Sequence, residues 1–177
     1  MKNEVLDVLK SRRAIRKFRP EQITAEELNA VLQCGIYAPT ACGRQSPVVI
    51  AVQDSEAVAT VAALNAKFTA SQNNPYYGAP TILLVLYDPD LALSEETAVL
   101  DCAAVCTNML NAAEAVGLGS CWIHRCHDMF ECAEGKALLR QWGLKDTLHG
   151  VASMALGYTD GDKPTPKARK TDYIVRI

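Results

Sequence analysis

The sequence predicts a single domain of the α+β class, with helices and buried strands around one core. Segments with the apolar period of a helix are interspersed with short apolar runs, and no linker, repeat or low-complexity stretch divides the chain. The 177 residues are enough for one domain with a sizeable core. With 49% hydrophobic and 21% charged residues, the composition is typical of a soluble globular protein.

Two helices and a strand are predicted at the start of the chain. Residues 3–11 place their apolar side chains on one helical face. Thr24 is the expected N-cap of the second helix, Glu27 completes a capping box, and Pro39 ends the helix. Residues 47–54 are an apolar run that indicates a buried strand.

The middle of the chain predicts a helix, a loop and a second buried strand. Residues 55–68 suit a helix, and residues 72–80 are rich in turn formers. Residues 81–88 form the second apolar run. A longer helix should begin at Ser94 and end near residue 116, before Gly117. Because this helix is apolar nearly all the way round, we expect it to be buried on all sides. The surface that covers it can include a second subunit.

The last third predicts a strand over 120–124, a helix over 131–142 and a strand over 150–158. The tail that follows contains several turn formers and then returns to an apolar sequence at 173–177. That ending resembles a strand that needs a sheet edge with which to pair.

The cations are concentrated at the two ends of the chain. Residues 1–19 hold seven of the 18 Lys and Arg and residues 163–177 hold five, with only three acids in the two segments together. This pattern fits either an anion site where the termini meet or two solubilising tails. The net charge of −2 does not suggest a general role on nucleic acids or membrane surfaces, although five cations in residues 12–19 leave a nucleic-acid or nuclear-import patch open.

Residues 121–132, "CWIHRCHDMFEC", raise the question of a metal or redox centre, because they hold three cysteines and two histidines. The C-x4-C pair could be combined with the C-x3-C pair of Cys102 and Cys106 into a zinc site. However, these cysteines fall on apolar elements, where free cysteine is a common core residue, so we expect no metal and no thiol catalysis. The absence of an apolar leader and of any long apolar run predicts a cytoplasmic protein with free thiols and no membrane span.

Arginine forks suit phosphate oxygens, which they bind through two hydrogen bonds. Arg12 and Arg16 are four residues apart and can share a helical face, and "KPTPKARK" supplies further cations on a proline-rich support. The two ends of the chain could therefore clamp one phosphate of a small ligand. Neither of the glycine-rich phosphate loops, G-x-G-x-x-G or G-x-x-x-x-G-K-[ST], is present.

Four motifs in order resemble a known family. They are "SRRAIRKF", "APTACGRQSP", "GLGSCWIH" and "ALGYTDGDKPTPKARK", and together they span essentially the whole chain. In this arrangement the chain resembles the short form of the FMN-dependent nitroreductases. The resemblance implies one FMN-binding domain over residues 1–177, with three α/β/α layers around a mostly antiparallel sheet. It also implies an intertwined homodimer, in which the tail from about 160 to 177 reaches across to the partner.

The resemblance also implies where the FMN lies. Arg12, Arg13, Ala14 and Arg16 would approach its phosphate, ribityl chain and ring edge. The backbone of Ile123, His124 and Arg125 would lie beside the reactive ring, with an N–H of His124 or Arg125 facing flavin N5. The other matched positions are a loop from the second subunit and two cations of the tail, which are Pro39, Thr40, Ala41, Gly43, Lys167 and Arg169.

The chain departs from the family at several of these positions. Ala14 stands where many members have serine, and Gly43 where many have asparagine. The residue that meets the polar edge of the ring is left open among Asn65, Asn73 and Asn74. The insertion that walls the substrate channel in larger members is absent, so the resemblance says least about the substrate.

The function that the resemblance implies is a ping-pong oxidoreductase with no catalytic side chain. NAD(P)H would give hydride to FMN, and a small-molecule acceptor such as a nitroaromatic or a quinone would take it. The flavin carries the redox chemistry, while the protein binds, orients and stabilises it. The alternative is a module that binds FMN and senses redox state without efficient turnover.

Overall fold

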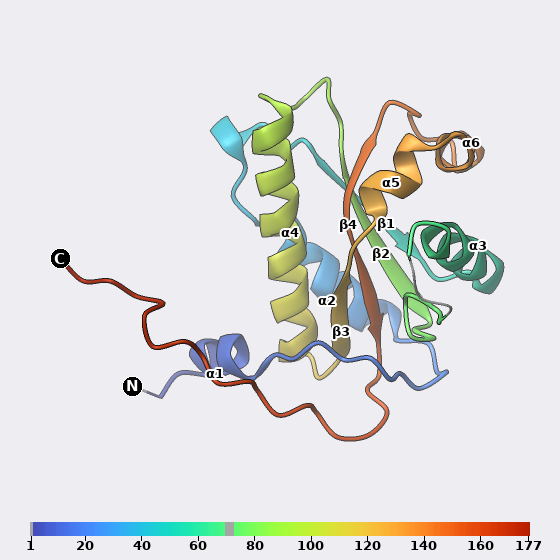
Figure 1. Cartoon of the computed structure of the whole chain (residues 1–177). Coiled ribbons are helices and arrows are strands. Elements are labelled where there is room, and N and C mark those ends of the chain that lie inside the picture. Colours follow the sequence, from blue (N-terminus) through green and yellow to red (C-terminus); the bar gives the residue numbers. More distant parts are fainter. Residues whose placement is uncertain (1, 70–72) are drawn as a thin grey trace.

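The computed structural model describes residues 2–69 and 73–177 (Figure 1). Gln72, the first residue of the predicted loop, lies outside the described residues. The helices and strands are, in chain order, α1 (Glu4–Ser11), α2 (Ala25–Ile36), the 3-10 turn η1 (Ala41–Gly43), β1 (Pro47–Val52), α3 (Ser55–Ala66), β2 (Thr81–Tyr87), α4 (Glu95–Ala115), β3 (Gly119–Ile123), α5 (Cys126–Glu131), α6 (Ala133–Gln141) and β4 (His149–Gly157).

The four strands form one antiparallel sheet in the order β1-β2-β4-β3. β2 and β4 are the inner strands, and β2 is buried along its whole length, as its uninterrupted apolar sequence predicts. The pairing of these two strands shifts by one residue, because Val85 faces Ala152 while Leu86 faces Gly150. This bulge lies beside the start of α5 and changes the direction of the first residues of β4.

Helices cover both faces of the sheet and give three layers (Figure 1). α2 and α4 lie on one face, where side chains such as Leu83, Val85 and Met109 form one apolar cluster. α3, α5 and α6 lie on the other face, where Ile82, Leu84 and neighbouring side chains form the second cluster. The α+β class, the antiparallel sheet and the three layers are therefore confirmed.

The helix ends that the sequence predicts are confirmed by their hydrogen bonds. The Glu27 N–H donates to Thr24 Oγ1 at 3.2 Å, and the Thr24 N–H donates to Glu27 Oε2 at 2.8 Å. Ser94 caps α4 in the same way. Gly117 ends α4 with a φ of +79°, and the next N–H donates back to the carbonyl of Ala113 at 2.8 Å.

The extent of one predicted helix is wrong, and a second helix in the same region was not predicted. The helix expected over 131–142 covers only Ala133–Gln141, and a separate short helix, α5, occupies Cys126–Glu131. The six residues of α5 are too few for a visible apolar period, and their Cys and His residues suggested a ligand motif instead. Cys132 ends one helix and begins the next, because its extended backbone breaks the helical path.

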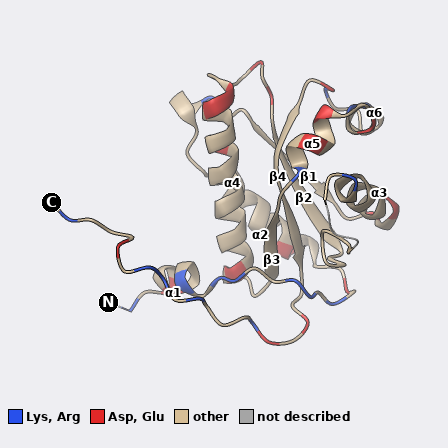
Figure 2. Cartoon of the chain, in the orientation of Figure 1, with Lys and Arg blue, Asp and Glu red and all other residues tan. Residues whose placement is uncertain are grey.

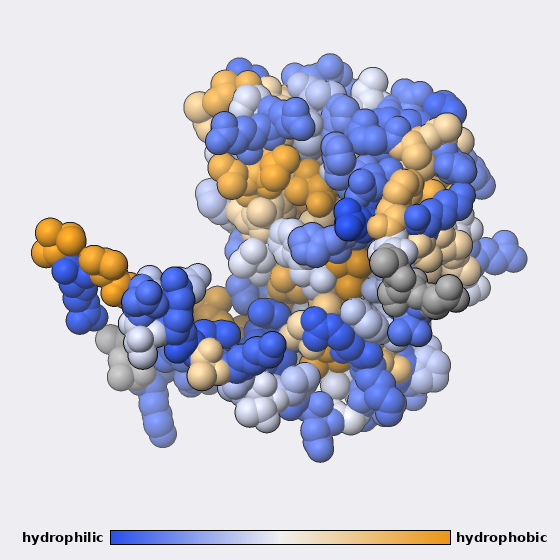
Figure 3. All heavy atoms as spheres, in the orientation of Figure 1, coloured by the Kyte–Doolittle hydropathy of each residue, from blue (hydrophilic) through white to orange (hydrophobic). Residues whose placement is uncertain are grey.

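The two ends of the chain leave apolar side chains exposed. Val5 and Leu9 of α1 are 66% and 51% exposed. After β4 the tail runs below α1 and away from the body, and its apolar end projects at the left of Figure 3. The strand predicted over 173–177 is not formed in the single chain, where these residues are exposed and pair with no strand. No helix within the described residues is long and apolar enough to span a bilayer.

Candidate active site

A cavity of about 450 Å³ opens where β3 runs into α5. This volume lies within the range of about 300–1,000 Å³ that small ligands and cofactors occupy. The residues lining the cavity come from the segment between α1 and α2, from α3 and the loop after it, and from the end of β3 and the turn that follows it. They are Arg16, Asn65, Thr69, Asn73, Asn74, Pro75, Tyr77, Cys121, Trp122, Ile123, His124 and Arg125.

The turn between β3 and α5 forms one side of this cavity. β3 ends at Ile123, and Arg125 adopts a left-handed backbone with φ 74° and ψ 8° before α5 begins. Among residues 2–69 and 73–177 no acceptor takes the N–H of Arg125. The Arg125 guanidinium lies 3.6 Å from Asp128, and both side chains are substantially exposed. The turn therefore leaves a backbone donor available beside the cavity.

Arg16 reaches the cavity because its segment pairs with the edge of the sheet. The Ile15 N–H donates to the Ser120 carbonyl at 2.9 Å, and Ala14 forms a parallel bridge with Ser120. The Arg16 guanidinium lies 5.9 Å from the centre of the Tyr77 ring, which is a cation–π contact. No carboxylate of the described residues forms an ion pair with Arg16. This leaves its charge available for an anionic or electron-rich ligand.

Two side chains that line the cavity carry buried polar atoms without a partner. Neither the Oδ1 atom of Asn65 nor the Nε1 atom of Trp122 has a hydrogen-bond partner within the described chain. An unsatisfied buried polar atom is costly, so such atoms indicate a missing partner. A ligand with its own donors and acceptors would supply one. Of the other candidate amides, Asn74 Oδ1 already accepts the Tyr76 N–H at 2.8 Å.

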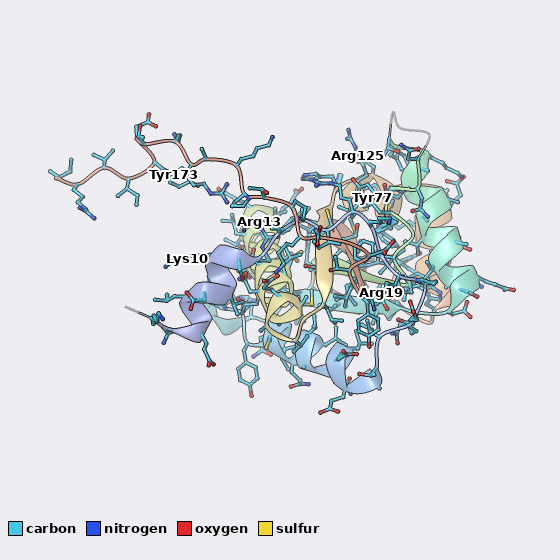
Figure 4. The ribbon with its side chains drawn as sticks, turned by 90° about the horizontal axis from the view of Figure 1, so that it is seen from below. Lys10, Arg13, Arg19, Tyr77, Arg125 and Tyr173 are labelled. Carbon is cyan, nitrogen blue, oxygen red and sulfur yellow. The ribbon has the colours of Figure 1, made fainter. Side chains whose placement is uncertain are left out.

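Arg12 and Arg13 lie beside this region at the end of α1. Arg13 donates to the carbonyls of Lys10 and Arg12, each at 2.7 Å, so its guanidinium is turned toward α1 (Figure 4). Arg12 is the C-cap of α1. Figure 2 shows the cations of residues 12–19 along the lower edge of the molecule. Of Arg12, Arg13 and Arg16, the structure brings only Arg16 to the cavity lining.

The predicted loop Pro39, Thr40, Ala41 and Gly43 lies elsewhere in the same chain. The Ala41 N–H donates to both carboxylate oxygens of Asp101, at 3.0 and 3.1 Å, which fixes the loop near the first turns of α4. The segment of Arg16 instead lies near the opposite end of α4. That end is some 13 residues, or about 20 Å, along the helix from Asp101. One chain therefore does not join this loop to the cavity.

The two ends of the chain do meet, as the charge pattern suggests. Lys17 and Asp160 form an ion pair at 2.7 Å, and Ser11 and Lys163 both contact the carboxylate of Glu114. Hydrogen bonding from these partners lowers the pKa of Glu114 against the opposing effect of burial, so the carboxylate stays ionised. Lys167 and Arg169 follow on the exposed tail and do not line the cavity.

Four of the seven cysteines, Cys102, Cys106, Cys121 and Cys126, are buried in the core. Burial raises the pKa of Cys102 and of Cys106 to about 12, so both thiols stay protonated at neutral pH. Burial also raises the pKa of Cys121 and of Cys126. Within the described part of the chain, His, Cys, Asp and Glu do not gather in any group of three or more that could hold a metal ion.

Sequence reasoning missed Tyr77 and Trp122, the two aromatic residues of the cavity. Tyr77 has a left-handed φ of 56° in a turn, which presents its ring toward Arg16. The signal was the paired tyrosines in a stretch of turn formers, since a loop held by turn chemistry can present an aromatic ring. Figure 4 shows Tyr77 and Arg125 close to one another at one end of the sheet.

Comparison with known proteins places these features in a family. Residues 9–158 match the profile of the Nitroreductase family. A protein of Archaeoglobus fulgidus, with the provisional name NADH dehydrogenase/NAD(P)H nitroreductase, is 30% identical over 162 residues, which are 90% of this chain and 88% of that protein.

Solved structures give the same result for the fold. The chain is similar to a nitroreductase of Bacteroides fragilis with bound FMN, with a TM-score of 0.89, 29% identity and coverage of 99% and 100% of the two chains. It is also similar to a nitroreductase of Desulfitobacterium hafniense with bound FMN, with a TM-score of 0.87, 25% identity and full coverage of both chains.

Proposed function

Because the chain belongs to the nitroreductase family, we propose that it is an FMN-dependent NAD(P)H oxidoreductase whose flavin occupies the cavity at the end of β3. The observation that carries this proposal is the set of unused polar groups around that cavity. The Arg125 N–H, the Asn65 amide oxygen and the Trp122 indole N–H all lack a partner within the described residues. A flavin carries both donors and acceptors and can satisfy such groups.

The residues of the cavity suit the parts of FMN. Tyr77 and Trp122 offer aromatic surface for a planar ring, and Arg16 offers a cation for its electron-rich edge or for the phosphate. The amide oxygen of Asn65 makes it our choice among the three asparagines for a polar contact to the ring. Ala14, Ile123 and His124 would contribute through their backbone.

When bound, FMN supplies the hydride chemistry by accepting hydride from NAD(P)H at N5 and passing it to a nitroaromatic, quinone or similar acceptor. The chain's own residues bind and orient the reactants. The Arg125 N–H, or that of His124, provides a fixed donor that does not titrate. The positive charge of Arg16 stabilises negative charge that develops on the ring. His124 is exposed at the rim of the cavity, so we assign no proton transfer to its side chain.

We also propose that the site is completed by a second copy of the chain. The loop Pro39, Thr40, Ala41 and Gly43 would come from the partner, since it lies far from the cavity of its own chain. Exposed apolar side chains support such an assembly: Leu100 on α4 is 64% exposed and Ile174 in the tail 73%. A groove of about 880 Å³ between α1, α2 and α4 adds further apolar surface. Lys167 and Arg169 would reach a phosphate through the same assembly.

The assembly is tested by the mass of the protein in solution. Sedimentation equilibrium should give twice the 19.2 kDa of one chain. Leu100→Lys should shift the protein toward the monomer, because it puts a charge into the apolar contact, and should release FMN with it. A matched change, Thr60→Lys, on the exposed side of α3 should leave the mass unchanged. A wild-type protein that sediments as a monomer and still holds FMN would contradict a shared site.

The proposed reaction is tested by initial rates with FMN-loaded protein. Varying NADH or NADPH at several fixed concentrations of a nitroaromatic or quinone should give parallel double-reciprocal lines, as expected for a ping-pong cycle. Protein stripped of FMN should be inactive, and added FMN should restore the rate. Intersecting lines would contradict the ping-pong order, and turnover by stripped protein would contradict the role of the flavin.

A further inference from the structure

The turn beside the cavity is held in a strained conformation. Arg125 has φ 74° and ψ 8°, in the left-handed region that costs a non-glycine residue about 1 kcal/mol or more. Such a conformation persists only where the surrounding structure fixes it. The turn is fixed through the carbonyls of the two preceding residues, Ile123 and His124, because buried side chains donate hydrogen bonds to both of them.

Two side chains from separate parts of the chain make these contacts, and a third joins them. Asn65 Nδ2 on α3 donates to the His124 carbonyl at 2.9 Å, and Ser153 Oγ on β4 donates to the Ile123 carbonyl at 3.2 Å. Tyr76, in the loop before β2, lies between the other two. Its hydroxyl is 2.9 Å from Ser153 Oγ and 3.2 Å from Asn65 Nδ2.

The hydrogens of this network can be assigned from chemistry alone. A carbonyl oxygen can only accept a hydrogen bond. The Asn65 atom beside the His124 carbonyl must therefore be the amide nitrogen, and the Ser153 hydroxyl must donate its one hydrogen to the Ile123 carbonyl. The Tyr76 hydroxyl therefore donates to Ser153 and accepts from Asn65. Asn65 Nδ2 also lies 3.1 Å from Met129 Sδ, a weak acceptor, so its two hydrogens serve the His124 carbonyl, the Tyr76 hydroxyl and this sulfur. The resulting series of hydrogen bonds runs from Asn65 through Tyr76 and Ser153 to the backbone of the turn.

The network is fully buried, which strengthens it and keeps it in one state. Asn65 and Ser153 are 0% exposed and Tyr76 is 1% exposed. Burial raises the pKa of Tyr76 well above its ordinary value, so its hydroxyl remains a donor at any physiological pH. In a low-dielectric interior the hydrogen bonds of such a network strengthen one another, and loss of one member leaves the others unpaired.

We propose that Asn65, Tyr76 and Ser153 act as a positioning relay that holds the β3–α5 turn so that its backbone N–H presents to the flavin. This inference rests on the proposed function, since it assigns FMN to the cavity. Tyr76 and Ser153 are positioning residues, because they act only through the backbone of the turn. Asn65 holds the His124 carbonyl through its Nδ2 atom and keeps its Oδ1 atom for the contact to the ring proposed above. Oxidised flavin accepts a hydrogen bond at N5, whereas reduced flavin carries a hydrogen there. A rigidly held donor therefore favours the oxidised form, and a loosened one should raise the midpoint potential.

Tyr76→Phe and Ser153→Ala test the relay, because each removes one hydroxyl and little volume. The matched control is Tyr87→Phe, which removes the hydroxyl of another buried tyrosine, one that packs with the cluster on the opposite face of the sheet. In apo-protein, amide hydrogen exchange over residues 123–126 should be at least several-fold faster in both variants than in the control. In FMN-loaded protein, the ratio of affinities for oxidised and reduced FMN should fall about tenfold, which raises a two-electron midpoint potential by about 30 mV.

The outcomes separate this inference from the proposed function. Folded variants with wild-type exchange over residues 123–126 and an unchanged midpoint potential would overturn the relay. An equal shift in Tyr87→Phe would do the same, because it would show a general effect of losing a buried hydroxyl. If wild-type protein takes up no FMN, the proposed function fails, while exchange in apo-protein still decides whether the three side chains hold the turn.

Discussion

Replacing Arg16 with glutamine is expected to weaken FMN binding by about 10- to 100-fold. Hydrogen bonds to a charged group contribute about 1.5–3 kcal/mol, and arginine can make two of them in parallel. Two arginines line the cavity, and Arg125 lies 3.6 Å from Asp128, whereas no carboxylate of the described chain forms an ion pair with Arg16. Quenching of FMN fluorescence during titration of stripped protein measures the dissociation constant directly.

Arg19→Gln is the matched control for this change. It removes the same charge from the same segment, but Arg19 does not line the cavity and its side chain is exposed. A loss confined to Arg16→Gln would locate the flavin at the cavity. Equal losses in both variants would mean that the whole basic segment attracts FMN through its field. Unchanged affinity in Arg16→Gln would remove this residue from the site.

Gly150→Ala is expected to destabilise the fold by about 3 kcal/mol or more, a large part of the 5–15 kcal/mol that a typical domain has. A Cβ atom at this position would overlap the carbonyl oxygen of Cys126 and lie 2.6 Å from its carbonyl carbon. Both atoms belong to backbone, at the point where the β4 bulge meets α5, so neither can turn away. Chemical denaturation gives the change in the free energy of unfolding.

A second glycine separates this overlap from the general cost of the substitution. Gly161 has a φ of +93° with no atom within 4 Å of an added Cβ, so Gly161→Ala should cost only the left-handed strain of about 1–2 kcal/mol. Gly150→Ala should therefore have the lower denaturation midpoint of the two variants. Similar midpoints would show that the backbone at Cys126 moves aside, and that the approach of β4 to α5 is looser than the structure indicates.

Features that depend on neighbouring residues could be predicted from the sequence. The capping box of Thr24 and Glu27 and the glycine stop after α4 are local hydrogen-bond patterns, so a few residues specify them. The buried strand β2 was also predicted, because an unbroken apolar run suits a strand covered on both faces. The resemblance placed Arg16 and the turn at 123–125 in one site, and the structure brings them to one cavity.

Features that depend on tertiary contact could not be predicted in this way. The short helix α5 is stabilised by packing on β4 and has too few residues to show a period. The left-handed Arg125 is held by Asn65 and Ser153, which are distant in sequence. The tail was predicted to end in a strand, but a strand forms only where it pairs with another, and residues 173–177 lie exposed away from the sheet in one chain. The role of the loop at 39–43 also depends on a second copy of the chain, so it stays a prediction for the assembled site.

This chain is expected to bind FMN and to use it to move hydride from NAD(P)H to an acceptor. The most direct test is an anaerobic absorbance spectrum of the purified protein, recorded before and after NADPH and then NADH. We expect flavin bands that bleach with at least one donor and return when a nitroaromatic is added. Bands that persist with both donors would contradict turnover and favour a redox-sensing module. Protein that is colourless and takes up no added FMN would contradict the flavin site itself.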